Sequence, residues 1–356
     1  MDNGYLEELG TKIQTGNNLL AFGGQTKSAL LAKDGITALD IGKISGILEY
    51  LPDEYTFTAY AGTSLYTINQ MLAEHDQFMP FDPPFIERGG TLGGTVASNL
   101  NGPGRFRYGG VRDFILGVKY LDYQAKLVRS GGKVVKNAAG FDISKLMVGS
   151  LGGLGAMIEL SFKVFPKPPE YRTVISRFST LEELLDTLVN LTANSIELFC
   201  LDIEPASEVY NLTIRLGGIP DLFPKRIERL KQFVGDIEIL EGDHERSFWD
   251  EINEFSWVPE DTLLIKVPIT PSSVETLDDF LSKNEIQRRY SVGANVAWIA
   301  WSKPVDIIDK HLKKIKLAGL TILGQTDQIR LGFREPDIFF QRIKNALDPI
   351  GKWVEI

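Results

Sequence analysis

The feature that most constrains this chain is a dense run of glycine in its first half. Of the 34 glycines among 356 residues, 16 lie between Gly89 and Gly155. Residues 84–140 also carry nine Lys or Arg against three acidic residues, although the whole chain has a net charge of −9. Glycine lets the backbone approach a ligand closely, and local positive charge favours an anion. This stretch therefore predicts a site in which the backbone surrounds an anionic ligand.

Length and composition exclude several classes of protein. The chain is long enough for two domains, and its 43% of hydrophobic residues suffices for packed cores. This composition excludes a disordered or collagen-like chain, and the single cysteine, Cys200, excludes a disulfide within it. There is no run of about 18 apolar residues and no signal-peptide pattern at the N-terminus. We expect a cytoplasmic protein without a membrane span, peripheral to a membrane only through partners.

A proline cluster divides the chain into two predicted domains. Pro166, Pro168 and Pro169 cannot extend a helix or join a strand ladder, so we expect one domain at residues 1–168 and another at 169–356. In the second domain, strand and helix patterns alternate, which predicts an α+β fold with helices on one face of a sheet. In the first, the patterns predict strands at 19–22, 38–41, 56–61 and 156–165, a helix at 64–75 and a hairpin at 114–129.

Two glycine turns are the candidate anion sites. The sequence contains neither a G-x-x-x-x-G-K-[ST] loop nor a G-x-G-x-x-G turn, which disfavours a P-loop nucleotidase and a Rossmann site. The turn Gly23-Gly24-Gln25-Thr26 instead follows a predicted strand, and a second turn lies at Gly90–Asn99. Backbone amides in such turns can converge on phosphate oxygens. The alternative is that both are simply tight turns in a β-rich domain.

Five segments, taken in order, resemble the FAD-binding domain of the vanillyl-alcohol oxidase/p-cresol methylhydroxylase (PCMH) family. Within that family the order is most similar to that of the small flavin-binding subunits of glycolate oxidases. The resemblance covers about residues 15–168 and is weak across 169–356, although Lys344, Asp348 and Pro349 also resemble the end of the family's pattern. The five segments are Gly23–Thr26, Gly89–Asn99, Tyr108–Asp113, Lys136–Asp142 and Lys145–Gly155.

The resemblance implies how this chain folds and binds its cofactor. It implies a PCMH-type FAD-binding domain of two subdomains over 1–168, followed by an α+β cap domain with an antiparallel sheet and a C-terminal helix. Relatives that attach flavin covalently use a His in the first glycine loop, where this chain has Gln25 and Thr26, so noncovalent FAD is implied. The implied FAD contacts are Phe22, Gly23, Gly24, Gln25, Thr26, Lys27, Ser28, Pro83, Gly90, Thr91, Gly93, Gly94, Ala97, Ser98, Asn99, Gly102, Gly109 and Ile158.

Candidates for catalysis are few. The resemblance places Asn137 and Phe141 near the flavin ring, with Phe141 at the family's usual tyrosine position; the alternative is that Asn137 only caps a turn. The three histidines lie far apart in the sequence, without metal-ligand spacing, so no metal site is expected. Among them His244 is the chemically suggestive one, and its alternative is a residue of a surface loop. The catalytic base is not identified.

These observations lead to one expected function and two alternatives. The resemblance implies a glycolate oxidase-like subunit that oxidises glycolate or a related 2-hydroxy acid by hydride transfer to flavin N5. Electrons would pass to a larger flavin subunit or an iron–sulfur subunit, since one cysteine cannot hold a cluster. The alternatives are a non-catalytic FAD-binding or assembly subunit and a stand-alone oxidase of another alcohol. The sequence has no basic helix with interspersed aromatic residues, so nucleic-acid binding is not expected.

Overall fold

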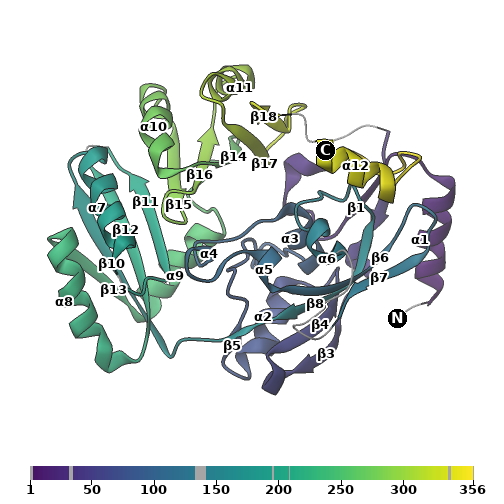
Figure 1. The fold of residues 1–356 in the computed structure, drawn as a ribbon, viewed down its shortest axis with the longest axis horizontal. Helices are drawn as coiled ribbons and strands as arrows, with labels where there is room; N and C mark the ends of the chain where they lie inside the picture. Colours follow the sequence, from purple (N-terminus) through teal and green to yellow (C-terminus); the bar gives the residue numbers. More distant parts are fainter. Residues whose placement is uncertain are drawn as a thin grey trace. The chain divides into compact units, whose positions relative to one another are not determined.

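A computed structural model describes residues 3–31, 35–132, 142–194, 196–207, 209–335 and 338–355. The chain divides into two compact units (Figure 1). Unit 1 comprises Met1–Asn101, Gly109–Lys167 and Glu335–Ile356, and unit 2 comprises Gly102–Tyr108 and Pro168–Arg334.

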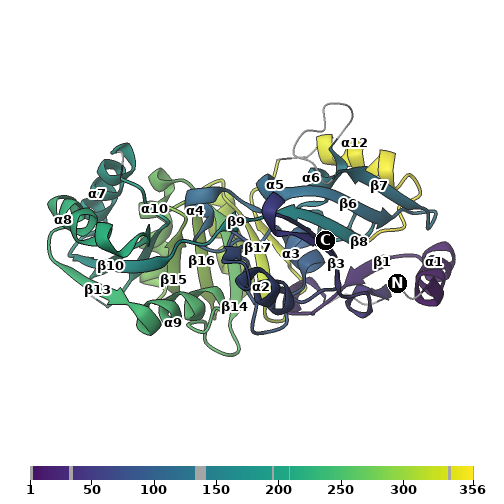
Figure 2. The same ribbon diagram turned by 90° about the horizontal axis from the view of Figure 1, so that it is seen from below.

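In its described residues, unit 1 contains three sheets. A parallel pair is formed by β1 (Leu19–Phe22) and β2 (Thr37–Asp40). A five-stranded antiparallel sheet has the order β3 (Ile47–Leu51), β4 (Thr56–Tyr60), β8 (Ala156–Lys163), β6 (Ile115–Leu121) and β7 (Leu127–Gly131), and Figure 2 shows β8, β6 and β7 side by side. A short antiparallel pair joins β5 (Gln77–Phe78) to β9 (Phe165–Pro166). The helices are α1 (Asn3–Thr15), α2 (Leu65–Ala73), α3 (Leu92–Ser98), α5 (Val111–Phe114), α6 (Ile143–Met147) and α12 (Ile338–Leu347), with 3-10 turns at Ser28–Leu30, Ile41–Lys43 and Pro52–Glu54.

The core of unit 1 follows from local sequence patterns. Along β8, Ile158, Leu160 and Phe162 are fully buried, while intervening residues are partly exposed, as the alternation in the sequence predicts. Helix α2 begins because the Ser64 hydroxyl accepts a 3.1 Å hydrogen bond from the Thr67 amide. The helix buries Leu65, Ile68 and Leu72 at helical spacing, and it ends at Ala73, two residues before the predicted end.

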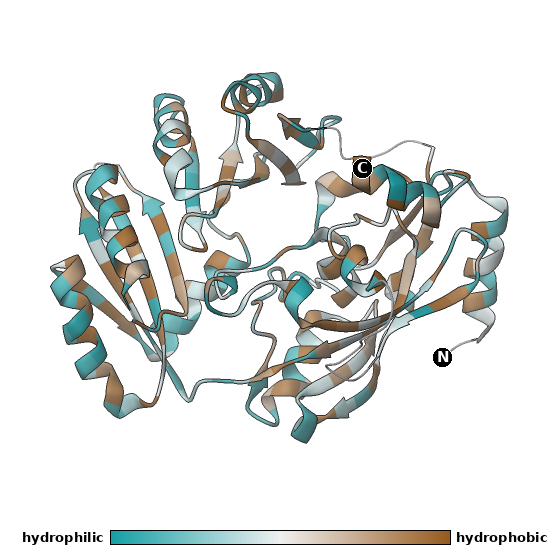
Figure 3. Ribbon diagram, in the orientation of Figure 1, coloured by the Kyte–Doolittle hydropathy of each residue, from teal (hydrophilic) through white to brown (hydrophobic). Residues whose placement is uncertain are grey.

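In the described part of unit 2, nine strands form one antiparallel sheet, in agreement with the predicted α+β class. Alternate strand residues such as Val174, Ile214 and Ile299 are fully buried in one core cluster, together with apolar residues of α7 (Leu181–Ala193), α8 (Phe223–Val234), α10 (Val274–Lys283) and α11 (Val305–Lys314). These helices carry polar outer surfaces (Figure 3).

The strand order is β13 (Ile237–Glu241), β10 (Glu170–Phe178), β12 (Tyr210–Gly218), β11 (Cys200–Pro205), β15 (Gln287–Ser291), β16 (Val296–Trp301), β14 (Leu263–Pro268), β17 (Ala318–Leu323) and β18 (Arg330–Gly332). The helices are α4 (Arg105–Tyr108), α7 (Leu181–Ala193), α8 (Phe223–Val234), α9 (Gly242–Asn253), α10 (Val274–Lys283) and α11 (Val305–Lys314), with 3-10 turns at Pro220–Leu222 and Pro271–Ser273.

Helix α9 departs from the predicted arrangement with helices on one face. Its Trp249 packs with Phe199 and Cys200, which lie outside the cluster that the other four helices cover. The Trp249 indole donates a 2.7 Å hydrogen bond to Thr173, and Arg215 pairs with buried Glu245 at 2.8 Å. These polar contacts hold α9 on the opposite face of the sheet, where a sequence pattern alone gives no sign of it.

The two compact units differ from the predicted domains, 1–168 and 169–356, in two segments. Gly102–Tyr108 belongs to unit 2, where Phe106 packs against the core cluster. Glu335–Ile356 returns to unit 1, because the Lys344 ammonium is buried there and donates to the carbonyls of Gly153 (2.6 Å) and Trp353 (2.9 Å). Both segments are held by contacts between residues far apart in the sequence, which composition does not reveal.

The C-terminal segment is fixed by a buried ion pair. Lys344 and Asp348, one turn apart on and after α12, are 2.8 Å apart, and the Asp348 side chain is fully buried. The Asp348 carboxylate also accepts hydrogen bonds from the Lys352 and Trp353 amides, both at 2.9 Å. The residues that follow then pair with β1, since the Leu19 amide donates to the Lys352 carbonyl at 2.8 Å.

Replacing Lys344 by Met should destabilise unit 1. The change leaves the Asp348 carboxylate buried without a cation, a loss of about 3–5 kcal/mol in the free energy of unfolding. Urea denaturation of the full chain would measure it. The matched control is Lys310→Met, which removes an ion pair of the same spacing, with Asp306, from the exposed surface of α11 and should change stability only slightly. Equal losses in the two variants would contradict this role of Lys344.

Candidate functional site

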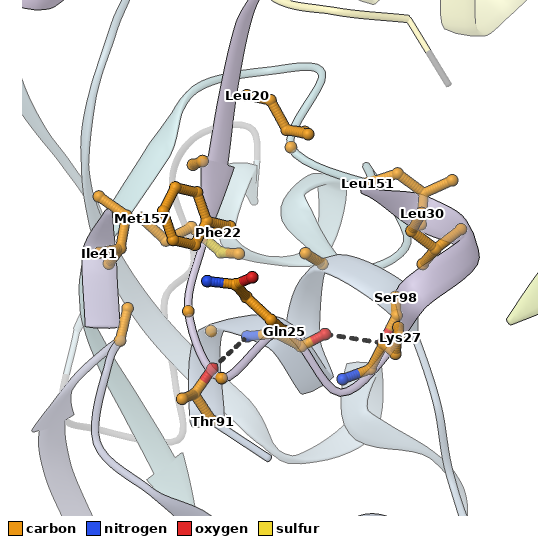
Figure 4. Close-up of a pocket in the computed structure, with 18 of the residues that line it drawn as sticks. Leu20, Phe22, Gln25, Lys27, Leu30, Ile41, Thr91, Ser98, Leu151 and Met157 are labelled. Carbon is orange, nitrogen blue, oxygen red and sulfur yellow. Dashed lines mark hydrogen bonds between the residues drawn. The ribbon is translucent and has the colours of Figure 1, made fainter. Parts of the chain in front are cut away.

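The two glycine turns meet at one pocket in unit 1. The pocket opens between the end of β1, the start of α3 and the turn that precedes β8. Figure 4 shows Phe22, Gln25, Lys27, Thr91 and Ser98 around it. The full lining is Leu20, Ala21, Phe22, Gly23, Gly24, Gln25, Thr26, Lys27, Leu30, Leu31, Ile41, Ala61, Thr91, Gly93, Gly94, Ala97, Ser98, Leu151, Gly152, Gly155 and Met157.

Glycine is required where the two turns touch. A Cβ atom on Gly24 would lie 1.9 Å from the Gly89 carbonyl oxygen, and one on Gly23 would lie 2.5 Å from the Thr91 hydroxyl. A side chain at Gly24 would require movement of the backbone, and one at Gly23 would have to displace the Thr91 side chain. The glycines therefore bring two stretches of main chain together and leave a pocket wall that is bare of side chains.

That wall offers hydrogen-bond donors. Within the described residues, the backbone amides of Gly24, Gln25 and Thr26 donate none of the hydrogen bonds. Gln25 is held at φ +52°, a left-handed conformation that non-glycine residues rarely adopt. Unpaired amides beside a pocket suit an anionic ligand with several acceptor oxygens, such as a pyrophosphate.

Helix α3 forms the adjoining wall. The Thr91 hydroxyl caps the helix by accepting a 3.3 Å hydrogen bond from the Gly94 amide, and Ser98 donates to the Gly94 carbonyl at 2.7 Å (Figure 4). A Cβ atom on Gly93 would lie 2.9 Å from Ala61, so glycine there lets α3 approach the residue that follows β4. The T-L-G-G sequence thus combines a cap with a close approach between elements.

A buried lysine supplies positive charge to the pocket. Lys27 is 9% exposed, and burial lowers its pKa from 10.5 to about 8. Its ammonium donates to the Thr26 hydroxyl at 3.1 Å and lies 5.6 Å from the centre of the Phe85 ring. None of the ion pairs among the described residues includes Lys27, so an anionic ligand would provide its counter-charge.

Comparison with known protein families accounts for this combination. Residues 13–131 match the model of a family described as FAD binding domain. Over residues 13–131 the chain is therefore similar to FAD-binding domains. FAD is therefore the cofactor that the glycine turns and Lys27 fit, as the sequence motifs predict.

Curated relatives support the same assignment. The chain is 41% identical over 163 residues to glycolate oxidase subunit GlcE of Escherichia coli, covering 46% of this chain and 47% of the relative. It is 30% identical over 146 residues to glycolate oxidase subunit GlcD of Bacillus subtilis (40% and 31%) and 26% identical over 224 residues to D-lactate dehydrogenase of Anaerostipes hadrus (63% and 46%). The matches thus span less than half the length of these relatives.

The fold is shared with a solved structure. An alkyldihydroxyacetonephosphate synthase aligns with 100% of this chain and 76% of its own, with a TM-score of 0.71 and 12% sequence identity. At that identity the likeness concerns the fold, and it agrees with the predicted PCMH-type α+β architecture. None of the helices in the described part of the chain is both long enough and apolar enough to cross a bilayer.

Eleven of the 18 predicted FAD contacts line the pocket of the FAD-binding domain. They are Phe22, Gly23, Gly24, Gln25, Thr26, Lys27, Thr91, Gly93, Gly94, Ala97 and Ser98. The other seven do not line it. Ser28 is exposed, Asn99 ends α3 in a left-handed conformation, and Gly102 belongs to unit 2. Pro83, Gly90, Gly109 and Ile158 lie elsewhere in unit 1.

Ten lining residues were not among the predicted contacts. The clearest case is Met157, which lines the pocket, whereas its neighbour Ile158 points to the opposite side of β8 and is fully buried. Alternation along β8 places the side chains of Met157 and Ile158 on opposite faces of the sheet. The sequence does not indicate which of these faces meets the pocket. The others are Leu20, Ala21, Leu30, Leu31, Ile41, Ala61, Leu151, Gly152 and Gly155.

The catalytic candidates stay untested. Asn137 and Phe141 lie outside the described residues. His244 is exposed on α9 of unit 2 rather than in a loop, because Gly242 at φ +59° begins a helix with Asp243 and Glu245 in its first turn. No three His, Cys, Asp or Glu side chains of the described residues come together in a way that could ligate a metal ion.

Replacing Gly24 by Ala should weaken FAD binding. The added methyl group would meet the Gly89 carbonyl at 1.9 Å, and the resulting backbone shift, at about 1–3 kcal/mol, would lower FAD affinity roughly 10-fold or more. Titration of the apoprotein with FAD, followed by quenching of flavin fluorescence, measures the change. Gly10→Ala is the control, since a Cβ there meets Ala125 at an ordinary 3.7 Å. Unchanged affinity in Gly24→Ala would contradict the close-approach argument.

FAD affinity should also fall as pH rises through the Lys27 pKa of about 8. The protonated ammonium favours an anionic ligand, so the dissociation constant should rise up to about 10-fold between pH 7 and 9. In the apoprotein the sign is opposite. The lowered pKa makes the Lys27 contribution to unfolding free energy increase with pH between about 8 and the ordinary value of 10.5.

Lys27→Met is the matching variant for that pH profile. Without a titrating ammonium it should bind FAD more weakly at pH 7, and its dissociation constant should stay nearly constant up to pH 9. A wild-type profile as flat as that of the variant would show that Lys27 does not face the bound anion.

Proposed function

We propose that this protein is a subunit that binds FAD noncovalently and oxidises a small 2-hydroxy acid, such as glycolate, to the 2-oxo acid. The observation that carries the proposal is the 41% identity to a glycolate oxidase subunit, together with the match of residues 13–131 to an FAD binding domain. The further similarity to a D-lactate dehydrogenase supports the wider class of 2-hydroxy acids.

Different residues of the pocket would contact different parts of FAD. The free amides of Gly24, Gln25 and Thr26 and the Lys27 ammonium would hold the pyrophosphate. Apolar side chains, including Phe22, Ile41 and Met157, would exclude water from the aromatic parts of the cofactor. Bound FAD supplies the acceptor for the hydride that leaves the hydroxyl-bearing carbon of the substrate.

The chemistry of the lining supports noncovalent attachment. Covalent flavin links need a reactive side chain such as His, Cys or Tyr. Among the described residues, the pocket is lined by none of these. The protein would therefore retain FAD through hydrogen bonds, charge and apolar contact.

The electrons would leave through partner subunits. The chain has one cysteine, Cys200, which is buried, whereas an iron–sulfur cluster needs several thiolate ligands. Both glycolate oxidase relatives are named as subunits. We therefore propose a complex with a larger flavin subunit and an iron–sulfur subunit.

The purified chain should be yellow, and acid precipitation should release the colour into the supernatant. Anaerobic addition of glycolate should then bleach the oxidised flavin band of the untreated protein, because each substrate molecule would give up a hydride (two electrons with one proton) to the flavin and release its hydroxyl proton. Addition of acetate, which lacks the hydroxyl group, is the control and should leave the band unchanged.

The other outcomes separate the alternatives. A yellow pellet would contradict noncovalent binding. Retained FAD that glycolate and D-lactate fail to bleach, both in the chain alone and in the complex with its partners, would contradict the enzyme and favour an assembly subunit. Turnover with oxygen alone would favour a stand-alone oxidase.

A further inference from the structure

One face of the large sheet in unit 2 carries a buried arginine and a partly buried lysine on either side of a tryptophan. Arg289 on β15 and Lys266 on β14 are both cross-strand partners of Trp298 on the intervening strand β16. Their sequence neighbours Tyr290, Ile265 and Val267 lie in the core cluster under the helices. Since side chains alternate along strands, Arg289, Trp298 and Lys266 share the opposite face.

Arg289 has an unfilled hydrogen-bonding edge. Its side chain is 5% exposed, and its Nη1 atom pairs with Glu204 at 3.0 Å. Its Nε and Nη2 atoms are buried without a hydrogen-bond partner among the described residues. These two nitrogens present parallel N–H bonds, the geometry that receives both oxygens of a carboxylate. Leaving them unpaired costs free energy, so the arrangement is suited to a ligand.

Both cations and carboxylates lie around this edge. Lys266 lies 5.9 Å from the Trp298 ring, and burial together with the charge of Arg105 lowers its pKa to about 8. The Asp202 carboxylate, which shares this face on β11, accepts hydrogen bonds from the Ser291 hydroxyl (2.8 Å) and the Val292 amide (3.2 Å). Glu204 is the carboxylate that pairs with Arg289. The two cations Lys266 and Arg105 thus equal in number the two carboxylates near this edge.

We propose that the Nε–Nη2 edge of Arg289 binds the carboxylate of a small organic acid, with Lys266 adding charge. The inference deepens the proposed function, since a 2-hydroxy acid presents this group. It names Arg289 as the residue that recognises the carboxylate and Lys266 as a second contributor. Both residues and their supporting strands belong to unit 2.

The test measures binding of acetate, glycolate and inorganic phosphate to the full chain with FAD bound, by calorimetry. Arg289→Lys keeps the charge and loses the paired edge, and it should weaken acetate and glycolate binding about 10-fold. Arg177→Lys is the control, because Arg177 on β10 of the same sheet pairs with Glu238 at the surface. Unchanged carboxylate affinity in Arg289→Lys, or binding of phosphate alone, would overturn the assignment.

A variant that should bind a carboxylate more tightly distinguishes an effect on the site from misfolding. Glu204→Gln removes the negative charge that competes at Arg289, so it should bind acetate more tightly than the wild type. Weaker binding in this variant would count against the site, and damage to the fold cannot produce the expected gain.

The two proposals fail in different ways. Acetate cannot be oxidised at a hydroxyl-bearing carbon. If acetate binds through Arg289 but glycolate does not bleach the flavin, the proposed carboxylate site is supported and the proposed oxidoreductase activity is contradicted. If glycolate bleaches the flavin at the same half-saturating concentration in the wild type and in Arg289→Lys, the oxidoreductase activity is supported and the role of Arg289 in binding the carboxylate is contradicted.

Discussion

The FAD pocket depends on one close approach between two stretches of main chain. The turn at Gly23-Gly24 lies so near the carbonyl of Gly89 that a methyl group at Gly24 would come within 1.9 Å of it. This contact removes side chains from one wall and leaves free amides there, and it sets Lys27 beside Gly94 at the start of α3. Burial of that lysine follows from the same packing. The backbone geometry and the electrostatics of the pocket therefore have a common origin in a few glycines.

The same walls are braced by the end of the chain. Lys344 reaches the carbonyl of Gly153, 191 residues earlier in the sequence, and the segment after Asp348 pairs with Leu19 on β1. Strand β1 and the turn before β8 both line the pocket, so the C-terminal residues hold two of its walls without lining it. A buried ion pair suits this task, because removing either partner leaves an uncompensated charge and the arrangement has few alternatives.

Sequence patterns predicted the features that depend on residues close together in the chain. They missed the features that depend on contacts between distant segments. The strand at 19–22, the alternation along β8 and the helix predicted at 64–75 depend on neighbouring residues, and each is present in the structure, the helix as Leu65–Ala73. The motif order also predicted the FAD-binding domain. Met157 rather than the predicted Ile158 lines the pocket, because alternation gives two faces and does not say which one meets the pocket. The return of residues 335–356 to unit 1 and the place of α9 were missed because long-range polar contacts fix them.

The buried cations fall into two groups: one group stabilises the fold, and the other is suited to binding a ligand. Arg215, Arg288 and Lys344 each have a buried carboxylate partner, in Glu245, Asp278 and Asp348, and these pairs hold elements together. Lys27 has no such partner among the described residues, and Arg289 uses one of its three nitrogens on the half-exposed Glu204. An acidic protein with a net charge of −9 has many carboxylates that could neutralise these two groups. Since a buried cation without full compensation is costly, its persistence in the fold is best explained by an anion that arrives from outside: a pyrophosphate at Lys27 and a carboxylate at Arg289.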